Sequence, residues 1–121
     1  IDFGKVGNLA EDRKLPYHTY NDLSQQPAVE ELIRGEVRLV NTQLPKPMQV
    51  VKGILLYKLL DADDEELTRT GKVRRKFVFQ QYKDLIDAMY ANKTELPVKG
   101  QVRYRDGHVG VIETTVKILT I

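Results

Sequence analysis

The C-terminal part of the chain carries an alternating pattern that requires a pair of antiparallel strands. Apolar and polar side chains alternate over residues 101–105 and again over residues 108–118, on either side of an Asp106-Gly107 step. Asp-Gly suits the positive φ angles of a two-residue type I′ turn, the commonest connection between adjacent antiparallel strands. Residues 98–121 are therefore expected to form a β-hairpin, and the rest of the chain has to supply the elements that pack on it.

Two further features refine the expected sheet. The apolar phase slips between Val111 and Ile112, which predicts a β-bulge near Gly110. Residues 50–60, VVKGILLYKLL, form a continuous apolar run that is typical of a strand covered on both faces. The sequence thus predicts a small sheet built from this strand and the hairpin.

Three segments have the periodicity of amphipathic helices. Residues 2–14 have Asp2 as a plausible cap, and residues 27–44 begin at Pro27, which suits the first position of a helix. Residues 75–90 show the clearest apolar stripe. Helices of this kind beside a small sheet place the chain in the α+β class. The stripe consists of Val78, Tyr82, Leu85, Ile86 and Met89.

Composition limits the functions that are open to the chain. With 121 residues, 41% hydrophobic and 30% charged, it is long enough for one domain with a core. A net charge of +2 is too small to indicate nucleic-acid binding by itself, and no apolar stretch approaches the ~18 residues of a membrane span. The absence of cysteine excludes thiol chemistry and fits a reducing compartment. His18 and His108 are expected at the surface, and no metal site is predicted.

Residues 66–76, ELTRTGKVRRK, place a Gly-Lys pair in a basic loop between the predicted strand and the last helix. A phosphate loop of the Walker type needs a glycine five positions before this pair and a serine or threonine after the lysine, because these groups wrap the phosphates and bind Mg²⁺. Glu66 and Val73 occupy those two positions. The loop therefore fails the motif on both counts.

Residue chemistry alone leaves two interpretations of this loop open. Five cations within residues 69–76 suffice for several phosphate contacts, as in a phosphate- or nucleic-acid-binding module. However, the acidic run 61–66 opposes that field, and no aromatic side chains are interleaved for base stacking. The other interpretation is a solvated loop whose acidic and basic runs pair locally, with each exposed pair contributing about 0–1 kcal/mol. In that case the acidic run is solvated surface.

Residues 66–90, ELTRTGKVRRKFVFQQYKDLIDAMY, closely resemble the end of long-chain fatty-acid–CoA ligases, which belong to the adenylate-forming superfamily. Those enzymes carry an ELT-x-T-x-K-x-(R/K)R stretch, an aromatic residue and then Y-x-x-(L/I)-I-x-x-(M/L)Y. Lys72 matches the lysine that is catalytic in the superfamily. Residues 1–60 are similar to the linker, long helix and strand that precede this stretch in the family. The hairpin is similar to a tail found in only some bacterial members.

This resemblance implies an AMP-forming acyl-CoA ligase. A fatty-acid carboxylate attacks the α-phosphate of Mg·ATP to give acyl-adenylate and pyrophosphate, and CoA then displaces AMP. The resemblance implies ATP, Mg²⁺ and CoA as cofactors, a large N-terminal adenylation domain as partner, and a mobile lid that carries Lys72 into the active site. Gly71, Thr70 and Arg74 are the accompanying candidates for substrate contacts.

The family's nucleotide-binding motifs and hinge segment are absent from the sequence, which starts Ile-Asp-Phe. We therefore expect residues 1–121 to be part of a C-terminal lid domain that is inactive alone, with a helix-rich part at 1–97 and a hairpin at 98–121. An uncovered edge strand invites pairing, so a dimer of the fragment is a further expectation. The resemblance implies a cytoplasmic enzyme, with peripheral membrane contact in its complete form and no nucleic-acid partner.

Overall fold

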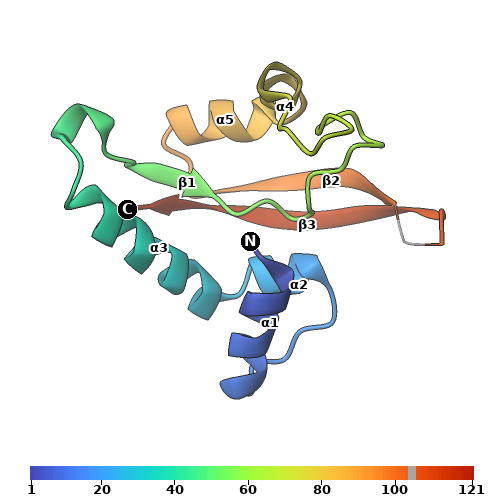
Figure 1. Ribbon diagram of the computed structural model, residues 1–121, viewed down its shortest axis with the longest axis horizontal. Coiled ribbons are helices and arrows are strands. Elements are labelled where there is room, and N and C mark those ends of the chain that lie inside the picture. The colour runs from blue at the N-terminus through green and yellow to red at the C-terminus, as the bar shows by residue number, and fades with distance from the viewer. Residues whose placement is uncertain (104–105) are drawn as a thin grey trace.

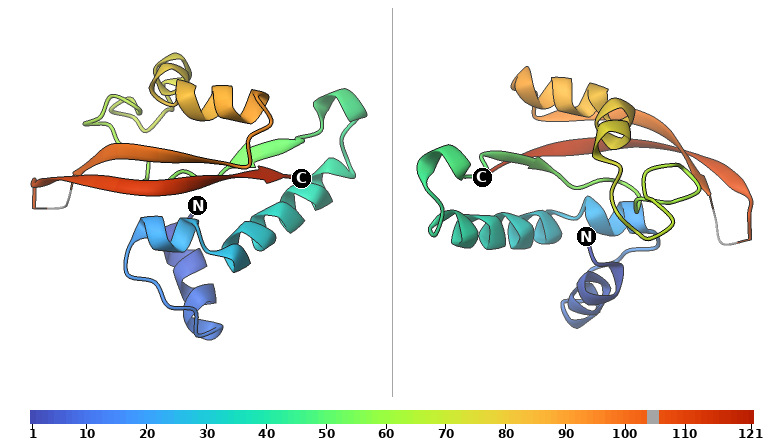
Figure 2. Two further views of the ribbon diagram at one scale, coloured as in Figure 1. Left: turned by 180° about the vertical axis from the view of Figure 1, so that it is seen from behind. Right: turned by 45° about the horizontal axis from the view of Figure 1, so that its top comes forward.

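Helices cover both faces of a small antiparallel sheet in the computed structural model, which describes residues 1–103 and 106–121 (Figure 1). The described strands follow the order β1-β3-β2. They are β1 (Lys52–Ile54), β2 (Glu95–Arg103) and β3 (Val109–Thr120). Helices α1 to α3 lie on one face of the sheet, and α4 and α5 lie on the other (Figures 1 and 2). The predicted α+β class is confirmed.

The N-terminal helices begin where short polar side chains can cap them. In α1 (Phe3–Asp12) the carboxylate of Asp2 accepts a first-turn N–H, as predicted. The short α2 (Tyr20–Ser24) was not predicted, although it starts at a capping box formed by Thr19. The third helix, α3 (Pro27–Asn41), begins at the predicted proline and ends three residues earlier than expected. A 3₁₀ turn, η1 (Lys46–Met48), leads on to β1.

The strand predicted over residues 50–60 is wrong beyond Ile54, where β1 ends. Continuing the register of β1 on β3 would place Leu55 opposite Lys117. The side-chain amide of Gln25 lies between them instead. Its nitrogen donates to the carbonyl of Leu55 at 2.9 Å, and its oxygen accepts from the backbone N–H of Lys117 at 3.2 Å. Because this amide replaces a strand–strand hydrogen bond, the chain leaves the sheet after Ile54.

The hairpin forms, but the predicted bulge near Gly110 is wrong, because β2 and β3 pair residue for residue along the whole of β2. The apolar phase slip has another cause: Val109 and Val111 are exposed, so both faces of β3 carry apolar side chains. Strand β2 begins at Glu95, earlier than the expected start of the hairpin, and includes Pro97. A proline is tolerated there because β2 is an edge strand.

The predicted two-residue turn is also wrong. The register places Arg103 opposite Val109, so the connection between the strands holds an odd number of residues. Gly107 nevertheless has the left-handed φ of +85° that its turn position demands. Tyr104 and Arg105, which the predicted turn would have paired in the ladder, lie outside the described residues.

Two apolar clusters lie on the two sides of the sheet. The first joins α1, α2 and α3 through Val6, Ala10, Leu23 and Val29. The second joins the sheet to the other helical layer through Tyr57, Tyr82, Leu85 and Val116.

The predicted helix over residues 75–90 is divided into α4 (Arg75–Gln81) and α5 (Lys83–Tyr90). The break falls at Tyr82, whose φ and ψ of −104° and 23° depart from helical values and whose side chain is buried. Over the described part of the chain, no helix is both long enough and apolar enough to cross a bilayer.

Candidate functional site

The Gly-Lys loop is folded as a small hairpin of its own. Leu67 and Val73 form an antiparallel bridge that closes it. Within it the backbone N–H of Thr68 donates to the carbonyl of Lys72 at 2.8 Å, and that of Gly71 donates to the carbonyl of Thr68 at 2.9 Å. The hydroxyl of Thr68 accepts from the backbone N–H of Lys72 at 3.0 Å. With a φ of +78°, Gly71 takes the left-handed conformation that closes the turn without strain.

Glu66, at the base of this loop, has a fully buried side chain that anchors the loop to the rest of the fold. The hydroxyl of Tyr82 donates to one carboxylate oxygen at 2.6 Å. The other oxygen accepts from the ammonium of Lys58 and from the backbone N–H of Asp61, both at 3.0 Å. The backbone carbonyl of Glu66 accepts from the N–H of Arg74 at 2.9 Å. A buried carboxylate is tolerated because it is paired and hydrogen-bonded in this way.

The expectation that the acidic run 61–66 is solvated surface is therefore wrong for Glu66. The overlooked signal is Lys58, the second of two lysines in the otherwise apolar run 50–60. A lysine in a buried segment needs a carboxylate nearby, and Asp64 and Glu66 supply two, at 2.7 and 3.0 Å.

The network shifts two proton equilibria. Burial raises the pKa of the Tyr82 hydroxyl well above its ordinary value, and the hydrogen bond to the Glu66 carboxylate raises it further. Burial by itself lowers the pKa of Lys58, but hydrogen bonds to Asp64 and Glu66 outweigh this effect and raise the pKa above its ordinary value. Both groups thus hold their protons more tightly when the chain is folded.

Alkaline pH should therefore destabilise the fold through this network. Above the ordinary tyrosine pKa of 10.0, the unfolded chain releases a proton that folded Tyr82 keeps. The contribution of Tyr82 to the free energy of unfolding is complete below that pH. Above it, this contribution falls by about 1.4 kcal/mol per pH unit. Urea titrations of the chain should show a drop between pH 9 and about 11 that is roughly 1.4 kcal/mol smaller in Tyr82→Phe. Tyr90 is 82% exposed, so Tyr90→Phe serves as the control and should leave the drop unchanged.

The predicted site residues all lie on this one loop. The side chain of Lys72 is exposed, and within the described residues its ammonium has no hydrogen bond or ion pair. The hydroxyl of Thr70 lies 3.1 Å from that of Thr68. The guanidinium of Arg74 donates to the carbonyl of Glu65 at 3.1 Å and lies 5.2 Å from the ring centre of Phe77.

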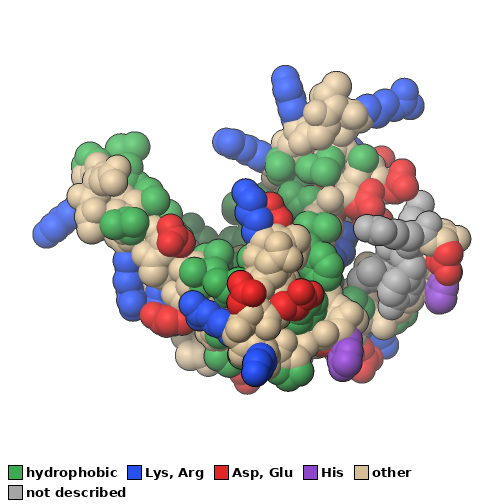
Figure 3. All heavy atoms as spheres, turned by 60° about the horizontal axis from the view of Figure 1, so that its bottom comes forward, with side chains coloured by type: hydrophobic (Ala, Val, Ile, Leu, Met, Phe, Trp, Pro, Cys, Tyr) green, Lys and Arg blue, Asp and Glu red, His purple; other side chains and the backbone are tan. Residues whose placement is uncertain are grey.

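The acidic run 61–66 and the basic residues of the loop pair with each other less than the interpretation of a solvated loop predicts. Arg74 has a distant pair with Glu65 at 4.0 Å, while Asp64 and Glu66 are taken up by Lys58. Across the part of the chain that the structure describes, the remaining cations of the loop have no carboxylate partner. Figure 3 shows one face of the molecule, with Lys and Arg side chains protruding singly and Asp and Glu between several of them. Within the described residues, the loop cations without a carboxylate partner are Arg69, Lys72, Arg75 and Lys76.

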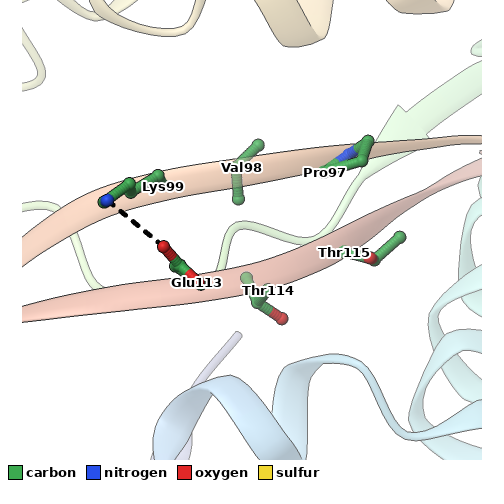
Figure 4. A pocket seen from close by; sticks show the side chains of 6 residues that line it. All are labelled: Pro97, Val98, Lys99, Glu113, Thr114 and Thr115. Atoms are coloured by element: carbon green, nitrogen blue, oxygen red, sulfur yellow. Dashed lines mark ion pairs between the residues drawn. The ribbon is translucent and has the colours of Figure 1, made fainter.

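A separate depression lies on the hairpin, lined by cross-strand neighbours of β2 and β3 (Figure 4). Lys99 and Glu113 point toward each other across it and pair at 3.2 Å. Thr114 points toward the helices below, where its hydroxyl accepts from the amide of Asn21 at 3.2 Å. The two charged side chains in this depression pair with each other, whereas several cations of the Gly-Lys loop have no partner within the described residues. We therefore assign the candidate site to the Gly-Lys loop.

Comparison with known families identifies one match that covers most of the chain. A family model described as AMP-binding enzyme C-terminal domain matches residues 12–94. The match covers more than two thirds of the chain, from α2 through the Gly-Lys loop to α5, and stops just before β2. Neither a curated protein nor a solved structure matches the chain.

Proposed function

The chain belongs to the family of C-terminal domains of AMP-binding enzymes, and from that premise we propose that it is the lid of a long-chain fatty-acid–CoA ligase. Membership makes it part of an adenylate-forming enzyme, in which such a domain works with a larger N-terminal domain. The finer proposal of a long-chain fatty acid as substrate and CoA as acceptor is supported by the resemblance of residues 66–90. The observation that supports a catalytic role is the exposed ammonium of Lys72, which has no partner within the described residues. It lies on a loop that the buried Glu66 anchors.

In the proposed adenylation step, a carboxylate oxygen of the fatty acid forms a bond to the α-phosphorus of ATP. The bond from that phosphorus to the bridging oxygen breaks, and pyrophosphate leaves. Two anions must approach each other for this step. The Lys72 ammonium, a compact charge on a flexible stem, is suited to bridge phosphate and carboxylate oxygens as charge shifts between them.

The loop fits some of the implied cofactors better than others. Its unpaired cations suit the phosphates of ATP and the phosphate groups of CoA. It offers less to Mg²⁺, which prefers carboxylate and water oxygens, because the nearby Asp64 and Glu66 are bound to Lys58. We therefore propose that Mg²⁺ is held by the nucleotide and the large domain. Gly71 and Thr70 would face the substrate from the turn, and Arg74 would serve mainly to shape the loop.

The substrate class can be tested with the complete enzyme. We expect carboxylate-dependent ATP–pyrophosphate exchange, with kcat/KM for hexadecanoate at least about 100-fold above that for acetate, because each buried CH₂ contributes about 0.8 kcal/mol. Equal or better use of acetate or an aromatic acid would contradict the proposed substrate. If no acid supports exchange while the chain binds polyphosphate or nucleic acid with an affinity that falls steeply as salt rises, the polyanion-binding alternative would replace it.

A further inference from the structure

Three segments of the chain meet at the buried carboxylate of Glu66. The first contains Tyr82, the junction of α4 and α5, and the second contains Lys58 and Asp61, which follow β1. The third is the Gly-Lys loop itself, whose stem is closed where the backbone of Glu66 accepts from Arg74. The reaction proposed above gives this carboxylate no part, so its presence in the core needs another reason.

Stability alone is a poor reason for a buried charged network. Taking a carboxylate and an ammonium out of water is costly, and apolar side chains of similar volume often stabilise a core equally well or better. What apolar contacts lack is direction, whereas the Glu66 carboxylate accepts three hydrogen bonds at 2.6, 3.0 and 3.0 Å from two separate segments. Such a network fixes the loop in one place relative to the helices and the sheet.

The free end of the loop needs this fixed position. Within the described residues, the Lys72 side chain has no partner that would hold it. Its position therefore depends on the backbone of the loop, which leads directly to Glu66. A displacement of about 1 Å in a reacting group can lower a rate by about 100-fold.

We propose that Glu66 is a positioning residue for adenylation, which holds the Gly-Lys loop so that Lys72 reaches the reacting carboxylate and α-phosphate. This inference rests on the proposed function. Glu66 itself touches no substrate and acts through Lys72. Tyr82 and Lys58 take part as the partners that keep its carboxylate oriented.

The test replaces Glu66 with glutamine in the complete enzyme and measures the two half-reactions separately. The amide has nearly the same shape, but its NH₂ group replaces one of the two accepting oxygens, which face the Tyr82 hydroxyl on one side and the Lys58 ammonium with the Asp61 N–H on the other, and it removes the negative charge that pairs with Lys58. We expect carboxylate-dependent pyrophosphate exchange to fall by about 10- to 100-fold in kcat. Thioester formation from supplied acyl-adenylate should stay within about twofold, because the family pattern has Lys72 rotated away in that step.

Two controls separate positioning from a general loss of structure. Glu65→Gln makes the same chemical change at the neighbouring exposed residue and should leave both half-reactions unchanged. Tyr82→Phe removes one hydrogen bond but keeps the carboxylate, so it serves if Glu66→Gln folds poorly. It should lower exchange by about 3- to 10-fold. An equal loss in both half-reactions, or no loss in either variant, would overturn the proposal.

A second readout does not depend on activity. Hydrogen exchange of the amides of Thr68 and Arg74, which close the loop and its stem, should quicken at least about tenfold in Glu66→Gln. Unchanged exchange rates of these amides would show that the carboxylate does not hold the loop, whatever the substrate. Failure of the proposed function looks different, since Lys72→Ala would then leave pyrophosphate exchange intact while the loop amides still respond to Glu66→Gln.

Discussion

Replacing Lys72 with alanine in the complete enzyme is expected to lower carboxylate-dependent ATP–pyrophosphate exchange by about 100- to 1,000-fold. The side chain is exposed and unpaired within the described residues, so its removal breaks no hydrogen bond or ion pair among them. The loss should appear in kcat, because the ammonium contributes most where charge shifts in the transition state. Thioester formation from supplied acyl-adenylate should survive, and the unfolding midpoint should not move.

The control for this substitution is Lys93→Ala, which removes a lysine from the exposed turn after α5. Both half-reactions of that variant should match those of the wild type. If Lys72→Ala keeps its exchange activity, the lysine has no part in adenylation. The unpaired cations of the loop would then call for another anionic partner, beginning with polyphosphate or nucleic acid.

The regular features of the fold were predictable because each follows from a local pattern. Asp2 and Pro27 mark the starts of α1 and α3, and the alternation after Pro97 marks the paired strands. The loop could also be located, since the Gly-Lys pair lies between two apolar segments. These signals act through neighbouring residues, where sequence distance and spatial distance agree.

The errors arose where a distant residue decides the local structure. Glu66 looked like one more member of an acidic run, but the hydroxyl of Tyr82, sixteen positions on, gives it a place in the core. The strand over residues 50–60 was predicted too long because Gln25, thirty positions from Leu55, takes the next hydrogen bond. Neither partner can be identified from periodicity, since both are single polar side chains in contact with residues far along the chain.

The role of Gln25 leads to the largest stability effect that we expect. Gln25→Ala removes the amide that bonds Leu55 and Lys117, and it leaves a carbonyl and an N–H without these partners at a half-buried edge. An unsatisfied buried group costs about 1–3 kcal/mol, so the free energy of unfolding should fall by roughly 2–4 kcal/mol in urea titrations of the chain. The slope of those titrations should stay the same, because the surface exposed on unfolding hardly changes.

The matched control is Gln43→Ala, which makes the same truncation at an exposed residue beyond α3 and should stay within about 0.5 kcal/mol of the wild type. If both variants are equally stable, the Gln25 amide is not what ends β1. Lengthening of β1 in Gln25→Ala would be informative in a different way. It would appear as protection of the Lys117 amide against hydrogen exchange that persists although the Gln25 side chain is gone, and it would mean that the apolar run can pair with β3 once the competing amide is removed. The free energy of unfolding would then fall by less than 2 kcal/mol, since the new strand pair would satisfy the same two backbone groups.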